Sequence, residues 1–156
     1  MQVLQGLFNN TILLCAISGW ASAQIIKTIL YAITNKSFRG ERLFGAGGMP
    51  SSHSATVCAL CTSVIIIYGI GSFEFAVCVV LAFITMYDAM GVRRETGNQA
   101  KVINEMMDVF KHMSDKAISQ NEKLKEFIGH TPLQVLAGAL LGVVIAILYC
   151  LGRGLM

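Results

Sequence analysis

Charged residues are scarce in this chain of 156 residues: Asp, Glu, Lys and Arg make up 13% of it, and hydrophobic residues make up 54%. A soluble globular domain carries about 25% charged residues, so the composition argues against a water-soluble protein. The apolar residues come in blocks of about 20, which is the length that crosses a bilayer. We therefore expect an integral membrane protein with one membrane-embedded domain over residues 1–156.

Two other features are missing. No charged residue precedes Lys27, so the first apolar block lacks the basic start of a cleaved signal peptide, and we expect it to be retained as a helix. A disulfide framework is not visible either, because every cysteine lies within an apolar block, as expected of small buried side chains. These cysteines are Cys15, Cys58, Cys61, Cys78 and Cys150.

Four blocks are predicted to span the membrane, over residues 10–33, 52–70, 73–90 and 132–151. Basic residues gather in the connections 34–51 and 91–131, whereas the N-terminus has none and the C-terminus has only Arg153. By the positive-inside rule, both basic connections face the cytoplasm and both termini lie outside. We expect a bacterial plasma membrane, and no nucleic-acid partner, because the basic residues follow the cytoplasmic side.

The longer basic connection contains apolar residues at helical spacing from Val102 to Ala117, with charged residues on the opposite face. This pattern predicts an amphipathic helix that lies on the membrane or covers a site. The expected fold class is therefore all-α: a membrane-embedded bundle of about four spanning helices plus a cytoplasmic amphipathic helix. Gly138 and Gly142 form G-x-x-x-G, which allows close helix packing, and small-residue faces of this kind are compatible with a homodimer.

Residues 47–55, which read GGMPSSHSA, have the properties of an anion site. Gly48 lets the backbone approach a ligand closely. Ser51 or Ser52 can cap the following helix, whose free N–H groups attract phosphate. His53 follows in the first turn, where it can exchange a proton near neutral pH. A well-capped helix start with a surface histidine explains this stretch equally well.

Other polar residues are expected at the same cytoplasmic level. His130 precedes the last helix, and Asp88 lies near the end of the third, shortly before Arg93 and Arg94. Two histidines with arginines suit phosphoryl transfer, in which arginines neutralise the phosphate, one imidazole attacks and the other protonates the leaving group. Asp88 could instead do no more than pair with one of the arginines.

Lys27 lies within the first apolar block, on the same helix face as Gln24. An ionisable group in a spanning helix is a functional candidate, and the alternative is that Lys27 extends to the membrane interface. Gln99 is a candidate for lining the site, although solvent exposure explains it equally well. Thr131 and Gln134 form a capping-box pattern at the last helix.

At residues 50–53, which read PSSH, the chain resembles the type-2 phosphatidic acid phosphatases and the related vanadium haloperoxidases. It resembles the divergent bacterial and plastid branch of that superfamily more closely. The matching runs are 47–56, 88–94, 97–100 and 129–132. The resemblance implies metal-independent hydrolysis of phosphate monoesters, often on lipids, without a cofactor. It also implies that His53 is the general acid and that His130 is the nucleophile that forms a phosphohistidine.

The chain departs from the superfamily pattern at three points. Gln134 stands where an acid should follow His130, so we hypothesise that Asp88 replaces that acid. Leu124 stands where an arginine is expected, which leaves the role to the arginines after Asp88. The first motif of the superfamily, K-x6-R-P, is absent as written, and Lys27 could stand in for its lysine. The residues expected to bind phosphate are Lys27, Arg42, Gly48, Ser51, Ser52, Arg93 and Arg94, supported by Gln134 and Gln99.

The leading hypothesis is a cytoplasm-facing phosphatase of a lipid phosphate, such as phosphatidylglycerol phosphate, phosphatidic acid or a polyprenyl phosphate. The alternative is a non-enzymatic lipid-phosphate binder or transporter, which the neutral Gln134 favours. A third hypothesis is a metal-assisted phosphatase in which Asp88 and Glu95 hold a divalent ion.

Overall fold

The computed structural model describes residues 1–37, 40, 47–113, 124 and 129–156, and this part of the chain is all-helical. Within these described residues, three helical stretches are long and apolar enough to cross a membrane, namely Thr11–Asn35, Phe73–Phe110 and Pro132–Gly152, while Ser52–Tyr68 is a shorter apolar helix of 17 residues. The predicted all-α class is confirmed, with three helices of spanning length where about four were expected. The helices are α1 (Gln2–Asn9), α2 (Thr11–Asn35), α3 (Ser52–Tyr68), α4 (Phe73–Met90), α5 (Val92–Met113) and α6 (Pro132–Gly152).

Local capping residues set most of the helix starts. The side chains of Asn10, Ser51 and Ser72 accept hydrogen bonds from backbone N–H groups in the first turns of α2, α3 and α4, as expected for N-cap residues. The predicted capping box of Thr131 and Gln134 is present at α6. The second predicted helix ends earlier than residue 70, because Gly69 has φ 82, a conformation that stops a helix. Helix α1 was not predicted.

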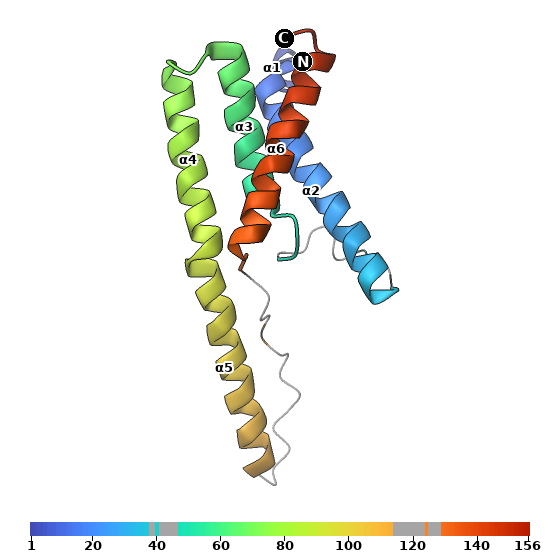
Figure 1. The fold of residues 1–156 in the computed structure, drawn as a ribbon, viewed down its shortest axis with the longest axis vertical. Helices are drawn as coiled ribbons and strands as arrows, with labels where there is room; N and C mark the ends of the chain where they lie inside the picture. The colour runs from blue at the N-terminus through green and yellow to red at the C-terminus, as the bar shows by residue number, and fades with distance from the viewer. Residues whose placement is uncertain (38–39, 41–46, 114–123, 125–128) are drawn as a thin grey trace.

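Helix α3 lies at the centre of the bundle and packs against α2, α4 and α6 (Figure 1). Its approach to α6 is close because α6 presents glycines there. A Cβ added at Gly138 would collide with the carbonyl oxygen of Ser51, and one added at Gly142 would collide with that of Ala55. The predicted use of G-x-x-x-G for close packing is thus confirmed, and the face is occupied by a helix of the same chain.

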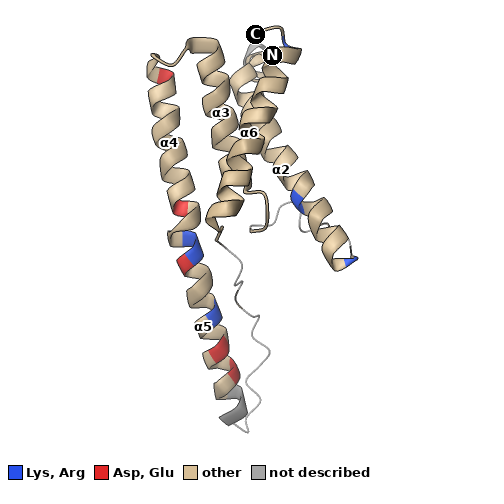
Figure 2. Cartoon of the chain, viewed as in Figure 1, with Lys and Arg blue, Asp and Glu red and all other residues tan. Residues whose placement is uncertain are grey.

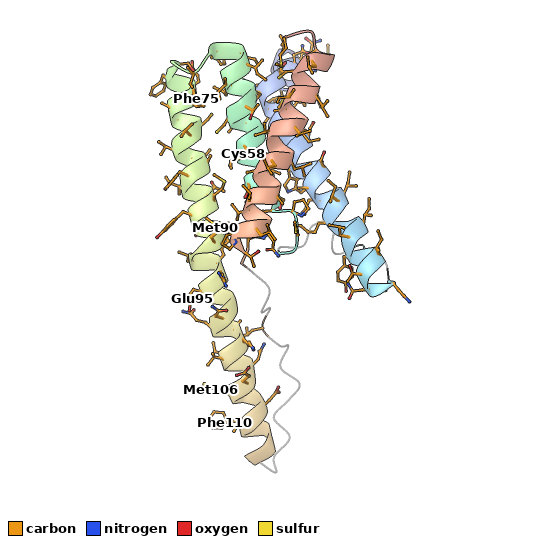
Figure 3. The ribbon with its side chains drawn as sticks, in the orientation of Figure 1. Cys58, Phe75, Met90, Glu95, Met106 and Phe110 are labelled. Carbon is orange, nitrogen blue, oxygen red and sulfur yellow. The ribbon has the colours of Figure 1, made fainter. Side chains whose placement is uncertain are left out.

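Helix α5 continues along the line of α4 away from the bundle, after a break at Gly91 (Figure 1). Acidic and basic residues concentrate on α5 and the adjoining end of α4 (Figure 2). The apolar side chains of Val102, Met106 and Phe110 are each more than half exposed, and Met106 and Phe110 lie well beyond the bundle (Figure 3). The predicted amphipathic helix therefore exists, but it projects from the bundle instead of covering the helix starts of α3 and α6.

Candidate functional site

The two predicted catalytic histidines lie side by side. His53 Nδ1, in the first turn of α3, is 3.4 Å from His130 Nε2, just before α6. The ring centroids are 5.6 Å apart and the rings are inclined at 67°. His130 is 1% exposed, whereas His53 is half-buried. The sequence separation of 77 residues is closed by packing, as predicted from the helix order.

Backbone contacts hold these two helix starts together. The N–H of Ser51 donates to the carbonyl of Gln134 at 3.0 Å, which joins the cap of α3 to the first turn of α6. The N–H of His130 donates to the carbonyl of Ala89 at 3.0 Å, which fixes the segment before α6 to the last turn of α4. His130 is therefore positioned by main-chain hydrogen bonds that do not depend on its own ring.

Gln134 orients the imidazole of His130. Its Oε1 accepts a hydrogen bond from the backbone N–H of Thr131 at 3.1 Å. Because a backbone N–H can only donate, the oxygen of the Gln134 amide, and not its NH₂ group, must face Thr131. The same oxygen lies 3.3 Å from His130 Nδ1. Nδ1 must then carry the proton, and the lone pair of Nε2 points toward His53. This is the tautomer that a nucleophilic Nε2 requires.

Asp88, which we hypothesised to replace the missing acid at His130, pairs with an arginine in this structure. Asp88 Oδ2 accepts from Arg93 Nε at 2.8 Å, in a surface ion pair whose side chains are 40% and 44% exposed. The orienting acceptor is Gln134, a neighbour of His130 on α6. Asp88 is therefore placed to position Arg93, which is the pairing that the sequence left open as the simpler explanation.

Lys27 reaches from α2 to the start of α3. Its side chain is buried, at 5% exposed, and its ammonium donates to Gln24 Oε1 at 2.7 Å and to Ser52 Oγ at 3.5 Å. Gly48, with φ 86, passes over the aliphatic part of Lys27, and a Cβ there would lie 3.2 Å from Lys27 Cγ. The cation thus points at the N-terminus of α3 and not along α2 to the membrane interface. From the sequence we predicted only that Gln24 shares a helix face with Lys27, and in the structure Gln24 accepts the hydrogen bond that positions this cation.

The electrostatics favour a neutral His130. Burial lowers the pKa of His130 below its usual value, and although the hydrogen bond to Gln134 opposes this, the positive charges of Lys27 and Arg93 lower the pKa further. At neutral pH its Nε2 is therefore unprotonated and able to attack phosphorus. Because the charge of Arg93 acts on His130, Arg93 is a candidate for the arginine of the site.

The remaining predicted residues lie elsewhere or outside the described part. Arg94 and Gln99 are exposed on α5, and the Arg94 backbone lies so close to Gly129 that a Cβ added at Gly129 would collide with it. Arg42 lies outside the residues that the structure describes. Glu95, proposed to share a metal with Asp88, accepts from Asn98 Nδ2 at 3.2 Å. Within the described ranges, no group of three or more His, Cys, Asp or Glu residues is placed to hold a metal.

An all-helical membrane protein with paired histidines at two helix starts fits the superfamily that the motifs resemble. The chain belongs to the Divergent PAP2 family, whose profile matches residues 8–145. It is 38% identical over 149 residues to the uncharacterized membrane protein YuiD of Bacillus subtilis (strain 168), which covers 90% of this chain and 94% of that protein. No solved structure matches the chain.

Proposed function

We propose that the protein hydrolyses a phosphate monoester on a membrane lipid through a phosphohistidine at His130. The observation that carries this proposal is the 3.4 Å contact between His53 Nδ1 and His130 Nε2. This contact supports the pairing of His53 as proton donor with His130 as nucleophile, and the charges of Lys27 and Arg93 act on His130. A solvated surface histidine pair would need neither the buried lysine nor the fixed tautomer.

The reaction follows from these positions. The phosphate binds at the N-terminus of α3, where free N–H groups, Lys27 and Arg93 offset its charge. His53 turns aside to admit it, His130 Nε2 attacks phosphorus in line, and His53 gives its proton to the departing alkoxide oxygen. His53, now neutral, takes a proton from water, whose oxygen attacks the phosphohistidine. Inorganic phosphate leaves, and His130 is restored.

The membrane setting selects the substrate class. The site lies at the end of the bundle from which the charged helix α5 projects (Figure 2). From the basic connections we infer that this end faces the cytoplasm and that both termini lie outside, in a bacterial plasma membrane. A lipid whose phosphate sits at the inner interface, such as phosphatidylglycerol phosphate, phosphatidic acid or a polyprenyl phosphate, can reach the helix starts from the bilayer.

The direct test is phosphate release by the purified full-length protein in detergent, with each of these three lipids and with soluble glycerol phosphate as the control. We expect release from at least one lipid phosphate, slower release from glycerol phosphate, and no change when a metal chelator is added. Saturable binding of every lipid phosphate without turnover would support the binder or transporter instead. Loss of activity with the chelator would support the metal-assisted mechanism instead.

Gln134→Glu is expected to shift the pH dependence of kcat/KM. His130 attacks in its neutral form, so activity falls as the pH drops through its pKa, which burial holds below the usual value. A carboxylate 3.3 Å from Nδ1 would stabilise the imidazolium and raise that pKa. The acidic limb of the profile should therefore move to higher pH. Gln99→Glu adds the same charge on the exposed face of α5 and should leave the limb in place; equal shifts in both variants would contradict the assigned role of Gln134.

A further inference from the structure

Two buried cysteines face each other at the end of the bundle opposite the histidines. Cys15, in the first turns of α2, and Cys150, in the last turn of α6, are each 0% exposed. Their sulfur atoms are 4.0 Å apart, and both thiols are free. Both chain termini lie at this end (Figure 1). The two cysteines belong to the first and the last of the described apolar helices that are long enough to span a membrane.

The arrangement suits a covalent bond between helices. A disulfide brings its sulfurs to about 2.0 Å, so the thiols need only rotate or shift slightly from 4.0 Å. The C-x-x-C pair differs, because Cys58 and Cys61 belong to one helix and a bond between them would hold together nothing that α3 does not already hold. A bond between Cys15 and Cys150 would instead join two separate helices, α2 and α6, whose sulfur atoms already lie 4.0 Å apart.

We propose that Cys15 and Cys150 are an oxidation site, at which a disulfide joins α2 to α6. The two thiols give up two protons and two electrons, one S–S bond forms, and the acceptor is reduced. Because both sulfurs are shielded in an apolar bundle, the acceptor must be a small uncharged compound that dissolves in the bilayer, and quinones belong to that class. The orientation we propose puts this end outside the cytoplasm, where disulfides persist.

The bond has a structural consequence for the other end of the bundle. Helix α2 carries Lys27, and α6 carries Gln134, four residues after His130. A disulfide at Cys15 and Cys150 limits how far these two helices can separate, and so it keeps the cation and the nucleophile in register. We expect the oxidised protein to unfold at a higher temperature than the reduced protein.

The test uses the purified full-length protein in detergent and the azo compound diamide as a bilayer-soluble two-electron acceptor. After oxidation, the protein is denatured, its free thiols are alkylated, and peptides are mapped by mass spectrometry. We expect two of the five cysteines to escape alkylation, a linked peptide pair containing Cys15 and Cys150, and recovery of both thiols with dithiothreitol. The unmodified sequence suffices for this measurement, so it does not depend on a variant that folds.

Matched variants sharpen the result. In Cys150→Ser, all four remaining thiols should be alkylated after diamide. In Cys58→Ser, Cys15 and Cys150 should escape alkylation as they do in the parent. The proposal is overturned if all five cysteines of the parent stay reactive, if the linked peptides contain another pair, or if the bond joins two chains.

Discussion

His130→Ala should abolish phosphate release, with a loss that exceeds the contribution of about 10²–10⁴ expected for a general acid or base alone. The physical reason is that no bond to phosphorus can form without Nε2, which the structure holds unprotonated and directed at His53. The measurement is the initial rate of phosphate release from the lipid phosphate with the highest parental rate. Rapid acid-free quenching with radiolabelled substrate should show a phosphohistidine in the parent and none in the variant.

The two histidines can be told apart by the leaving group. His53→Ala removes the proton donor, so it should slow hydrolysis of an alkyl phosphate lipid strongly. It should slow the first, phosphoenzyme-forming step much less for an aryl phosphate, whose phenolate leaves without a proton. His130→Ala should be inactive on both compounds. His112→Gln, near the far end of α5, is the control for removing a histidine. Full activity in His130→Ala would rule out the nucleophile assigned here. Equal slowing of the alkyl and the aryl phosphate in His53→Ala would rule out the assigned proton donor.

Lys27→Met should reduce kcat by about 100-fold, on the order of 3 kcal/mol of transition-state stabilisation, because a preorganised donor to the reacting phosphate is lost. Lys27 is buried beside the start of α3, within hydrogen-bonding distance of Ser52 Oγ. Methionine fills a similar volume without a charge, so the variant avoids the desolvation cost of a buried ammonium. We therefore expect the variant to unfold at the same temperature as the parent or higher.

The stability measurement separates catalysis from structure for this residue. Lys101→Met, at an exposed position of α5 whose side chain is 65% exposed, is the matched control and should change neither rate nor unfolding temperature. Lys27→Arg keeps the charge and should retain part of the activity. If Lys27→Met unfolded far below the parent while the surviving folded protein kept its rate, Lys27 would be a structural residue and the anion site would need another cation.

Features that depend on neighbouring residues were predictable from the sequence. The bounds of α4 match the predicted 73–90, and the capping box at α6 is where Thr131 and Gln134 place it. Helix ends follow from hydrogen bonds that span three or four residues, so a short stretch contains all the groups involved. The pairing of His53 with His130 also followed, because two helices that begin on the same side of a membrane bring their first turns to one level.

The choice among partners could not be predicted in this way. Asp88 was a candidate for His130 and for the arginines, and only the structure shows it on Arg93. Gln134 looked like a lost acid, yet its oxygen serves the α6 cap and the imidazole at once. These outcomes depend on differences of an ångström or two between side chains on separate elements, which the packing of the helices sets.

The sequence by itself determined the membrane class, the positions of the apolar helices and the residues that can meet at one end of the bundle, because composition and local capping specify them. Only the tertiary structure decided that Lys27 points at α3, that Gln134 orients His130, and that Cys15 meets Cys150. For Lys27 and Cys15 the physical reason is distance along the chain, because each meets a partner on another helix. Gln134 is only four residues from His130, and its contact depends on how the start of α6 is held against α3 and α4. Glycines such as Gly138 let these helices come close.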